Sequence, residues 1–150
     1  MQFLVTAIEI LKNDDGSLKA LCFFTPDMIQ SMKSWPEFLS MDATYCLINL
    51  DYQVILIIVV DGNGESHIVA ICISSDESAL TYEWFLQQFK KHHGSACDKI
   101  QCVMGDKDSL QRDVIYKILG VIVYICIWHS QKIFQRTVST KEMGISKEER

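Results

Sequence analysis

Seven consecutive apolar residues, at positions 54–60, constrain the fold of this chain more than any other feature. A strand that faces water on one side alternates apolar and polar residues, whereas this run has no polar face. We therefore expect a central strand over 52–60 with both of its sides covered. The run is far shorter than the roughly 20 residues needed to cross a bilayer, so we expect no membrane partner.

Two further strands flank this run and predict an antiparallel meander. Residues 38–50 alternate, with Leu39 and Met41 on one face and Asp42 on the other. Residues 67–74 return after Asp61-Gly62-Asn63-Gly64, a tight-turn sequence because Asn and Gly tolerate positive φ.

The segment before the meander predicts a hairpin and a short helix. Residues 3–11 and 18–24 are rich in strand formers and flank Asn13-Asp14-Asp15-Gly16. Thr25-Pro26 then opens a helix, and Trp35-Pro36 closes it. We divide the chain into residues 1–37, an N-terminal hairpin and short helix, 38–138, the core, and 139–150, a charged tail. The tail begins like a capped helix and stops, so we expect a C-terminally truncated gene product.

After the meander the apolar spacing changes to that of helices. Tyr82, Phe85, Leu86 and Phe89 lie on one helical face. Each later strand follows a helix, so right-handed crossovers should make these strands parallel to their neighbours. The predicted fold class is α/β: a mixed five-stranded sheet, three antiparallel strands then β-α-β-α, with helices on both faces and the N-terminal hairpin. The later elements are a strand at 100–104, a helix at 110–119, a strand at 121–127 and a helix at 128–138.

Two acids lie where this topology brings them together if the first meander strand and the strand at 100–104 are neighbours. Asp42 lies on the polar face of its strand, and Asp106 directly follows the strand at 100–104. Ligands tend to bind at the carboxyl ends of strands in such sheets, so both carboxylates should converge on one cleft. There they would hold Mg²⁺ or Mn²⁺ for phosphodiester chemistry. The alternative is that Asp106 or Asp108 only caps a helix and Asp42 is a hydrogen-bonded edge residue.

Several short motifs, spread over residues 18–138, resemble one known family. Residues 38–45, Phe-Leu-Ser-Met-Asp-Ala-Thr-Tyr, resemble a strand of Mutator-like element (MULE) transposases, and residues 103–108 resemble that family's second-aspartate turn. Glu77-Ser78 with the following helix is similar to its first core helix, and residues 126–129 to its Cys-x-x-His element. The same pattern occurs in the RNase H-like domain of SWIM zinc-finger proteins, which resemble domesticated transposases.

The resemblance implies a DDE-type RNase H-like fold, with Asp42 and Asp106 as metal-binding acids. It also implies Mg²⁺ or Mn²⁺ as cofactor, if the domain is active. The family's third acid is a Glu on a later helix. Glu77 could approach the cleft, but a first-turn Glu that stabilises a helix dipole is the simpler explanation. The glutamates after Asp106 lie in the charged tail, so the predicted site is incomplete: Glu142, Glu148 and Glu149.

Cysteine and histidine are zinc ligands, so zinc is the other metal to consider. Cys126 and His129 are two ligands where a structural zinc site needs four, so we expect Cys126 to end the last strand and His129 to lie beside the acids. A second set of residues with zinc-ligand side chains does not predict a zinc site either, because Cys102 falls in a buried strand. This set is His92, His93, Cys97 and Cys102. The six cysteines form no Cys-x-x-Cys pair, which indicates reduced core thiols of an intracellular protein.

Charge limits the functions that remain. Lys and Arg number 14 against 19 acids, a net charge of −5, which argues against a free-standing nucleic-acid binder. We predict a transposase-derived RNase H-like domain, catalytically incomplete, acting as a DNA-associated or protein-interaction module with DNA or chromatin proteins as partners. The alternative is an active metal-dependent DDE nuclease or transposase core. The resemblance implies the nucleus, composition alone allows the cytoplasm, and the oligomeric state is left open.

Overall fold

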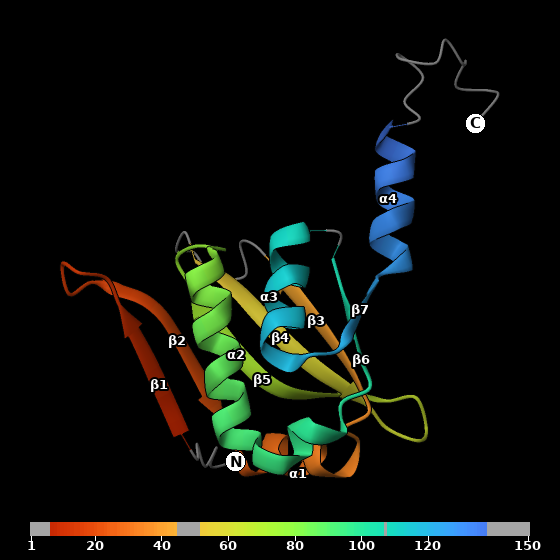
Figure 1. Cartoon of the computed structure of the whole chain (residues 1–150), viewed down its shortest axis with the longest axis horizontal. Helices are drawn as coiled ribbons and strands as arrows, with labels where there is room; N and C mark the ends of the chain where they lie inside the picture. Colours follow the sequence, from red (N-terminus) through yellow and green to blue (C-terminus); the bar gives the residue numbers. More distant parts are fainter. Residues whose placement is uncertain (1–6, 45–51, 107, 138–150) are drawn as a thin grey trace.

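A seven-stranded mixed sheet organises the chain, in the order β1-β2-β5-β4-β3-β6-β7 (Figure 1). The computed structural model describes residues 7–44, 52–106 and 108–137. The predicted α/β class with a mixed sheet is confirmed. The strands are β1 (Ala7–Lys12), β2 (Leu18–Phe24), β3 (Phe38–Thr44), β4 (Gln53–Val60), β5 (Ser66–Ser74), β6 (Cys102–Gly105) and β7 (Ile122–Ile125).

The sheet has seven strands instead of five because the N-terminal hairpin joins it. β2 pairs antiparallel with β5, so that Cys22 lies opposite Cys72 and Phe23 opposite Ile71. β3, β4 and β5 form the predicted antiparallel meander. A pairing between segments about fifty residues apart leaves no local signal in the sequence, and for that reason the hairpin could not be placed in advance.

Two crossover helices build the parallel half of the sheet. The chain leaves β5, passes through α2 (Ala79–His93) and the short η1 (Gly94–Lys99), and returns as β6 parallel to β3. It then passes through α3 (Ser109–Leu119) and returns as β7 parallel to β6.

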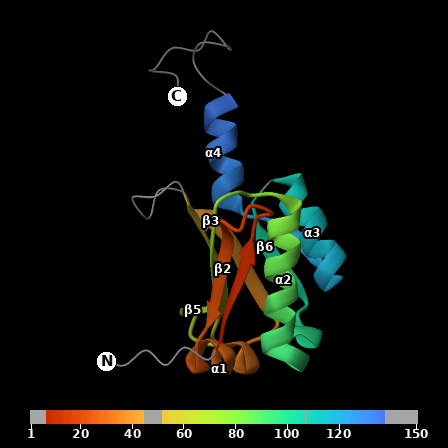
Figure 2. The same cartoon turned by 90° about the vertical axis from the view of Figure 1, so that its left-hand side faces the viewer.

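Both crossover helices lie on the same face of the sheet, and the expectation of helices on both faces is wrong for the described residues. Figure 2 shows α2 and α3 side by side against one side of the strands, and they contact each other. The reason is chirality. The two crossovers move the chain in the same direction along the sheet, so one handedness places both helices on one face.

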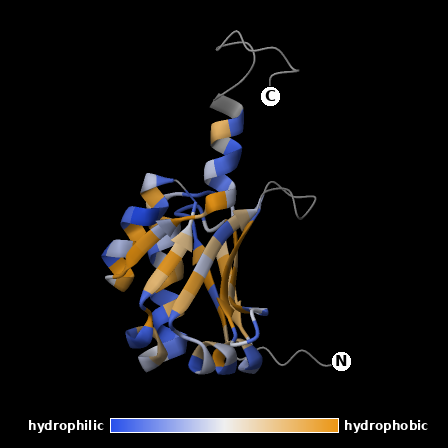
Figure 3. Cartoon of the chain, turned by 90° about the vertical axis from the view of Figure 1, so that its right-hand side faces the viewer, coloured by the Kyte–Doolittle hydropathy of each residue, from blue (hydrophilic) through white to orange (hydrophobic). Residues whose placement is uncertain are grey.

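The burial of side chains along the central strand, β4, shows the same difference between the two faces of the sheet. In β4, residues 53, 55, 57 and 59 are buried, whereas residues 54, 56, 58 and 60 are only half-buried. The expectation that both sides of this strand are covered is therefore wrong within the described part of the chain. We call the uncovered side the open face; Figure 3 shows the hydrophobic character of the strands that form it. It consists of Ile8, Ile10, Leu21, Phe23, Val54, Leu56, Ile58, Ile68, Ile71 and Ile73.

The core lies on the opposite face, between the sheet and α2. Its largest fully buried side chains include Tyr82, Phe85 and Phe89, which are three of the four residues predicted to form the apolar face of this helix. α1 (Pro26–Ser34) closes one end of the core and contributes the buried Met32. The described cysteines are free thiols, and burial raises the pKa of Cys22 to about 12.

Helix ends follow the predicted capping residues. The Thr25 side chain accepts a hydrogen bond from the Met28 N–H, with Pro26 in the first turn of α1. Ser78 caps α2, and Gly120 ends α3 with a positive φ of 71°.

The last described helix, α4 (Ile127–Thr137), stands beyond the end of the sheet (Figures 1 and 2). The strand predicted over 121–127 ends at Ile125, because the Cys126 N–H bonds to the Gly105 carbonyl and the helix begins at the next residue. Residues 45–50 of the first predicted meander strand and the tail at 139–150 lie outside the described residues. No helix in the described ranges is long and apolar enough to span a membrane.

Candidate functional site

Asp42 and Asp106 lie at the same level of two adjacent parallel strands. Ser40 of β3 pairs with Met104 of β6, and each acid follows two residues further along its own chain. The alternation of β3 buries Met41 toward the helices and directs Asp42 to the other side, where its side chain is 53% exposed. The Asp106 side chain is 41% exposed. Parallel pairing thus brings the two carboxylates to one end of the sheet.

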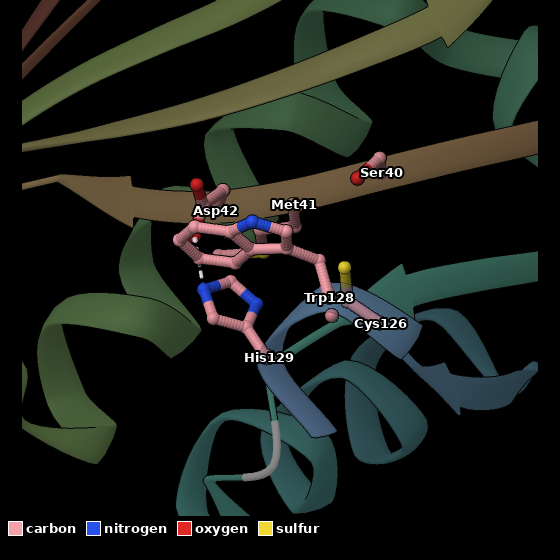
Figure 4. A pocket seen from close by; sticks show the side chains of 7 residues that line it. Ser40, Met41, Asp42, Cys126, Trp128 and His129 are labelled. Carbon is pink, nitrogen blue, oxygen red and sulfur yellow. Dashed lines mark ion pairs between the residues drawn. The ribbon is translucent and has the colours of Figure 1, made fainter. Parts of the chain in front are cut away.

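His129 lies between these two carboxylates. Its Nε2 is 4.0 Å from Asp42 Oδ1 (Figure 4), and its Nδ1 is 3.8 Å from Asp106 Oδ1. The ring comes from the first turn of α4, which follows β7 along the edge of β6. The bond from the Cys126 N–H to the Gly105 carbonyl, at 2.9 Å, fixes where that turn starts.

A pocket of about 270 Å³ opens at this point. Trp128 forms one wall, with its ring packed edge-on against that of His129 at 4.8 Å between centroids. The Lys132 ammonium lies 3.8 Å from the Trp128 ring centroid, a cation–π contact that holds the indole in place. The pocket is lined by Ser40, Met41, Asp42, Gly105, Cys126, Trp128 and His129.

Gly105 and Gln111 position the second acid. A Cβ on Gly105 would lie 3.0 Å from Gln111 Oε1 and 3.7 Å from a Val123 methyl, so a larger residue here would require Gln111 to shift by a few tenths of an ångström. The same Gln111 oxygen accepts a hydrogen bond from the Asp106 N–H at 3.3 Å, and Gln111 is almost fully buried. Asp106 is therefore oriented by α3, while Asp108 is the residue that caps that helix.

Sequence reasoning missed Gln111 and the wall residue Trp128. A signal for Gln111 was present: with Val114, Ile115 and Ile118 it follows the i, i+3, i+4, i+7 spacing of the apolar stripe of α3. A polar residue on such a stripe is buried, and a buried amide needs hydrogen-bond partners.

The donors present fit a divalent cation that accepts mixed ligands. Carboxylate oxygens suit Mg²⁺ and Mn²⁺, and imidazole suits the softer first-row metals. His129 Nδ1 is buried and has no hydrogen-bond partner among the described residues, and 3.8 Å to Asp106 is too long for one. An ion held by Asp106 together with His129 would satisfy that nitrogen and supply Lewis acidity to a bound phosphate oxygen.

Glu77 does not line this pocket. It was predicted to lie in the first turn of α2, but that turn contains no acid and Glu77 precedes the cap Ser78. Asp76 organises this helix start instead, since its Oδ1 accepts from the hydroxyl groups of Ser78 and Thr81, and its Oδ2 pairs with Lys19. Burial raises the pKa of Asp76, but the bonds from Thr81, Lys19 and Ser78 outweigh it and hold the pKa below the usual range.

The other candidate metal ligands are engaged elsewhere. His92 Nε2 lies 2.8 Å from Glu9 Oε1, and His93 Nε2 lies 3.0 Å from the Val69 carbonyl oxygen. One group of three metal-binding side chains lies within 4.8 Å in the described ranges, at the β4–β5 turn: Asp61, Glu65 and His67. There Asp61 accepts bonds from two backbone N–H groups and from His67, as the predicted tight turn requires.

The mixed sheet, the same-face crossovers and the acids at the ends of β3 and β6 define an RNase H-like domain. The family model for the RNase H-like domain of zinc finger SWIM domain-containing protein 1/3 matches residues 4–121, more than three quarters of the chain. The chain belongs to this family. Asp42 and Asp106 lie within the matched range, and Cys126 and His129 follow it. No curated protein matches the sequence significantly.

Proposed function

We propose that this RNase H-like domain does not cleave nucleic acid and acts as a protein-interaction module, with any contact to DNA or chromatin made in company with other proteins. The observation that carries the proposal is the composition of the pocket. It presents one carboxylate, Asp42, beside a second, Asp106, and the ring of His129 lies between them. Among the described lining residues of the pocket Asp42 is the one acid, and Asp106 lies beside them on the other side of His129.

Phosphodiester cleavage by two metal ions needs carboxylates that hold both ions in line with the attacking and leaving oxygens. Asp42 and Asp106 face opposite nitrogens of one imidazole, so either acid with His129 supplies two ligands for one ion. The glutamates that follow Asp106 in the sequence, Glu142, Glu148 and Glu149, lie outside the described residues. Glu77 does not line the pocket. A weakly held Mn²⁺ without turnover is what such a donor set supports.

The second candidate is an active metal-dependent nuclease of transposase ancestry. One observation favours it: Asp42 and Asp106 lie level on adjacent parallel strands, and both side chains are partly exposed to solvent. In that case His129 would be the third ligand and would replace the missing acid.

A nicking assay on supercoiled plasmid separates the two candidates. With millimolar Mn²⁺ or Mg²⁺ we expect no nicking above that of the matched Asp42→Asn variant. Mn²⁺-dependent nicking by the native chain that disappears in Asp42→Asn and in Asp106→Asn would overturn the proposal. Glu77→Gln is the matched control, because it removes a carboxylate that does not line the pocket.

Thermal unfolding in the same buffers tests the metal part of the proposal independently. A ligand that binds only the folded state raises its stability by RT ln(1 + [L]/Kd), so an ion with a Kd of about 1 mM adds about 1.4 kcal/mol at 10 mM. We expect a small Mn²⁺-dependent rise in Tm that is lost in Asp42→Asn. A rise of the same size in that variant would place the ion elsewhere, with Asp61, Glu65 and His67 the first alternative.

A further inference from the structure

Two cysteines face each other across the junction between the N-terminal hairpin and the rest of the sheet. The register pairs Cys22 of β2 directly with Cys72 of β5. Both residues are completely buried in the core, so their side chains lie on the same, helix-covered face of the sheet. Neither residue lines the pocket of the candidate site, and an inference about this pair is therefore independent of the proposed function.

The hydrogen bonds next to this pair determine how close the two cysteines come. In an antiparallel ladder, hydrogen-bonded pairs alternate with non-hydrogen-bonded pairs, whose Cα atoms are closer, at about 4.5 Å. The Ser75 N–H donates to the Lys19 carbonyl at 2.9 Å, which makes Lys19 and Ser75 a hydrogen-bonded pair. Cys22 and Cys72 lie an odd number of residues along from that pair in the same register, so they form a non-hydrogen-bonded pair.

A disulfide needs the geometry that such a pair provides. Disulfide-bonded cysteines have Cα atoms about 4.4 to 6.8 Å apart and Cβ atoms that face each other. Directly opposite residues on one face of an antiparallel pair approach in this way, and most closely where the pair is not hydrogen-bonded. Burial raises the pKa of Cys72, and the neighbouring Cys22 raises it further, as expected for two sulfur atoms close to each other.

We propose that Cys22 and Cys72 form a redox-sensitive dithiol, which a hydroperoxide converts to a disulfide that locks the N-terminal hairpin onto the sheet. Within the sheet, the hairpin joins the meander by the pairing of β2 with β5. This pairing covers four residue pairs, of which the two cysteines are one. A bond between them makes the junction covalent.

Opening of the hairpin controls when the bond can form. In the closed sheet, burial raises the pKa of Cys22 to about 12, so the reactive thiolate is scarce. Proteins also open locally, in cooperative units that often coincide with supersecondary motifs such as a hairpin. Separation of β2 from β5 exposes both thiols to water and to the oxidant, and closing brings them together again.

The chemistry has two steps. In the open state, one thiolate attacks the O–O bond of hydrogen peroxide; an S–O bond forms, and the hydroxide that leaves takes up the proton lost by the thiol. After the hairpin closes, the second sulfur attacks the sulfenic sulfur, so that the S–S bond forms, the S–O bond breaks and a second water leaves with the second thiol proton. Together the two thiols lose two electrons and two protons, and the peroxide is reduced to two waters.

Peptide mapping of the full chain under non-reducing conditions, after millimolar hydrogen peroxide and alkylation of the remaining thiols, tests the bond. We expect a peptide that links Cys22 to Cys72, formed several times faster in urea below the unfolding midpoint, because urea favours the open hairpin. In Cys72→Ala the linked peptide should be absent. Cys97→Ala is the matched control, since it removes a buried cysteine of η1, outside the strand pairings, and should oxidise like the native chain.

Thermal unfolding measures the lock. The bond closes a loop of about 50 residues, so we expect the Tm of the oxidised chain to rise by about 5 to 15 °C and dithiothreitol to reverse the rise. Near-UV circular dichroism establishes that Cys72→Ala is folded; if it is not, Cys22→Ala replaces it. A native chain that yields no linked peptide, or links these cysteines equally to others, would overturn the inference, and so would a linked chain with an unchanged Tm. Plasmid nicking bears only on the proposed function.

Discussion

The buried imidazole of His93 makes the stability of this domain depend on pH in a defined window. His93 is 3% exposed in the core, near Phe24 and Phe89, and its Nε2 lies 3.0 Å from the Val69 carbonyl oxygen. Burial lowers its pKa to about 4 from the ordinary 6.5, because a charged ring would lose its hydration there. A shift of that size corresponds to about 3 kcal/mol between the two protonation states.

The sign follows from proton uptake. The unfolded chain binds a proton at this ring near pH 6.5, and the folded chain does so only near pH 4. The contribution of His93 to stability is therefore complete above pH 6.5 and is lost as the pH falls toward 4, with a slope of at most about 1.4 kcal/mol per pH unit. Typical domains are stable by about 5 to 15 kcal/mol, so the loss is a large fraction of the total.

Urea unfolding between pH 4 and pH 7.5, on the native chain and on His93→Gln, measures this contribution. Glutamine keeps an N–H donor for the Val69 carbonyl and removes the titration. Between pH 7 and pH 4 we expect the native free energy of unfolding to fall by about 3 kcal/mol more than that of the variant. Lys91 and His92 hold the pKa of Glu9 low, but that titration lies below pH 4.5 and is common to both proteins. Parallel curves for the two proteins would refute the reasoning.

Substitutions at three further positions test how the second acid and the helix that follows it are held. Gly105→Ala should cost about 1 to 3 kcal/mol by overpacking against Gln111, measured by urea unfolding; an unchanged midpoint would show that the neighbour yields without cost. Gln111→Leu removes the acceptor for the Asp106 N–H, and we expect a loss of about 1 to 3 kcal/mol together with a smaller Mn²⁺-dependent rise in Tm; an undiminished rise would contradict the positioning role. Asp108→Ala should cost about 1 kcal/mol through the lost cap of α3, and Asp108→Ser should recover most of it; equal losses in both would contradict the capping role.

Local chemistry made much of the fold predictable. The cap Thr25 is a short-range feature and stands where its residue type predicted. Ser78 at the start of α2 and Gly120 at the end of α3 are short-range features of the same kind. Crossover geometry predicted that the later strands run parallel to their neighbours, and β6 pairs parallel with β3. The approach of Asp42 and Asp106 was predicted on the condition that their two strands are neighbours, and the structure meets that condition. Their role as metal ligands stays a prediction.

Two features could not be predicted from the sequence: the pairing of strands far apart in the chain, and whether a hydrophobic face of the sheet is covered. The register that places Cys22 of β2 opposite Cys72 of β5 depends on where the N-terminal hairpin docks on the sheet. The spacing of residues along the sequence does not encode that position. The apolar run at 54–60 predicted cover on both faces because one sequence cannot say whether a hydrophobic face is closed by its own chain or by another body. Gln111 was not predicted as a site residue because the residues that share its face of α3 are apolar and typical of a packed core.

The position of Asp42 at the end of a row has a thermodynamic consequence. The row from Ile8 to Leu56 crosses the open face and continues into this acid, so a body seated on the row also touches the wall of the cleft. An ion in the cleft and a neighbour on the sheet then share one free-energy cycle. If the bound ion changes the affinity for the neighbour by some factor, the bound neighbour must change the affinity for the ion by the same factor.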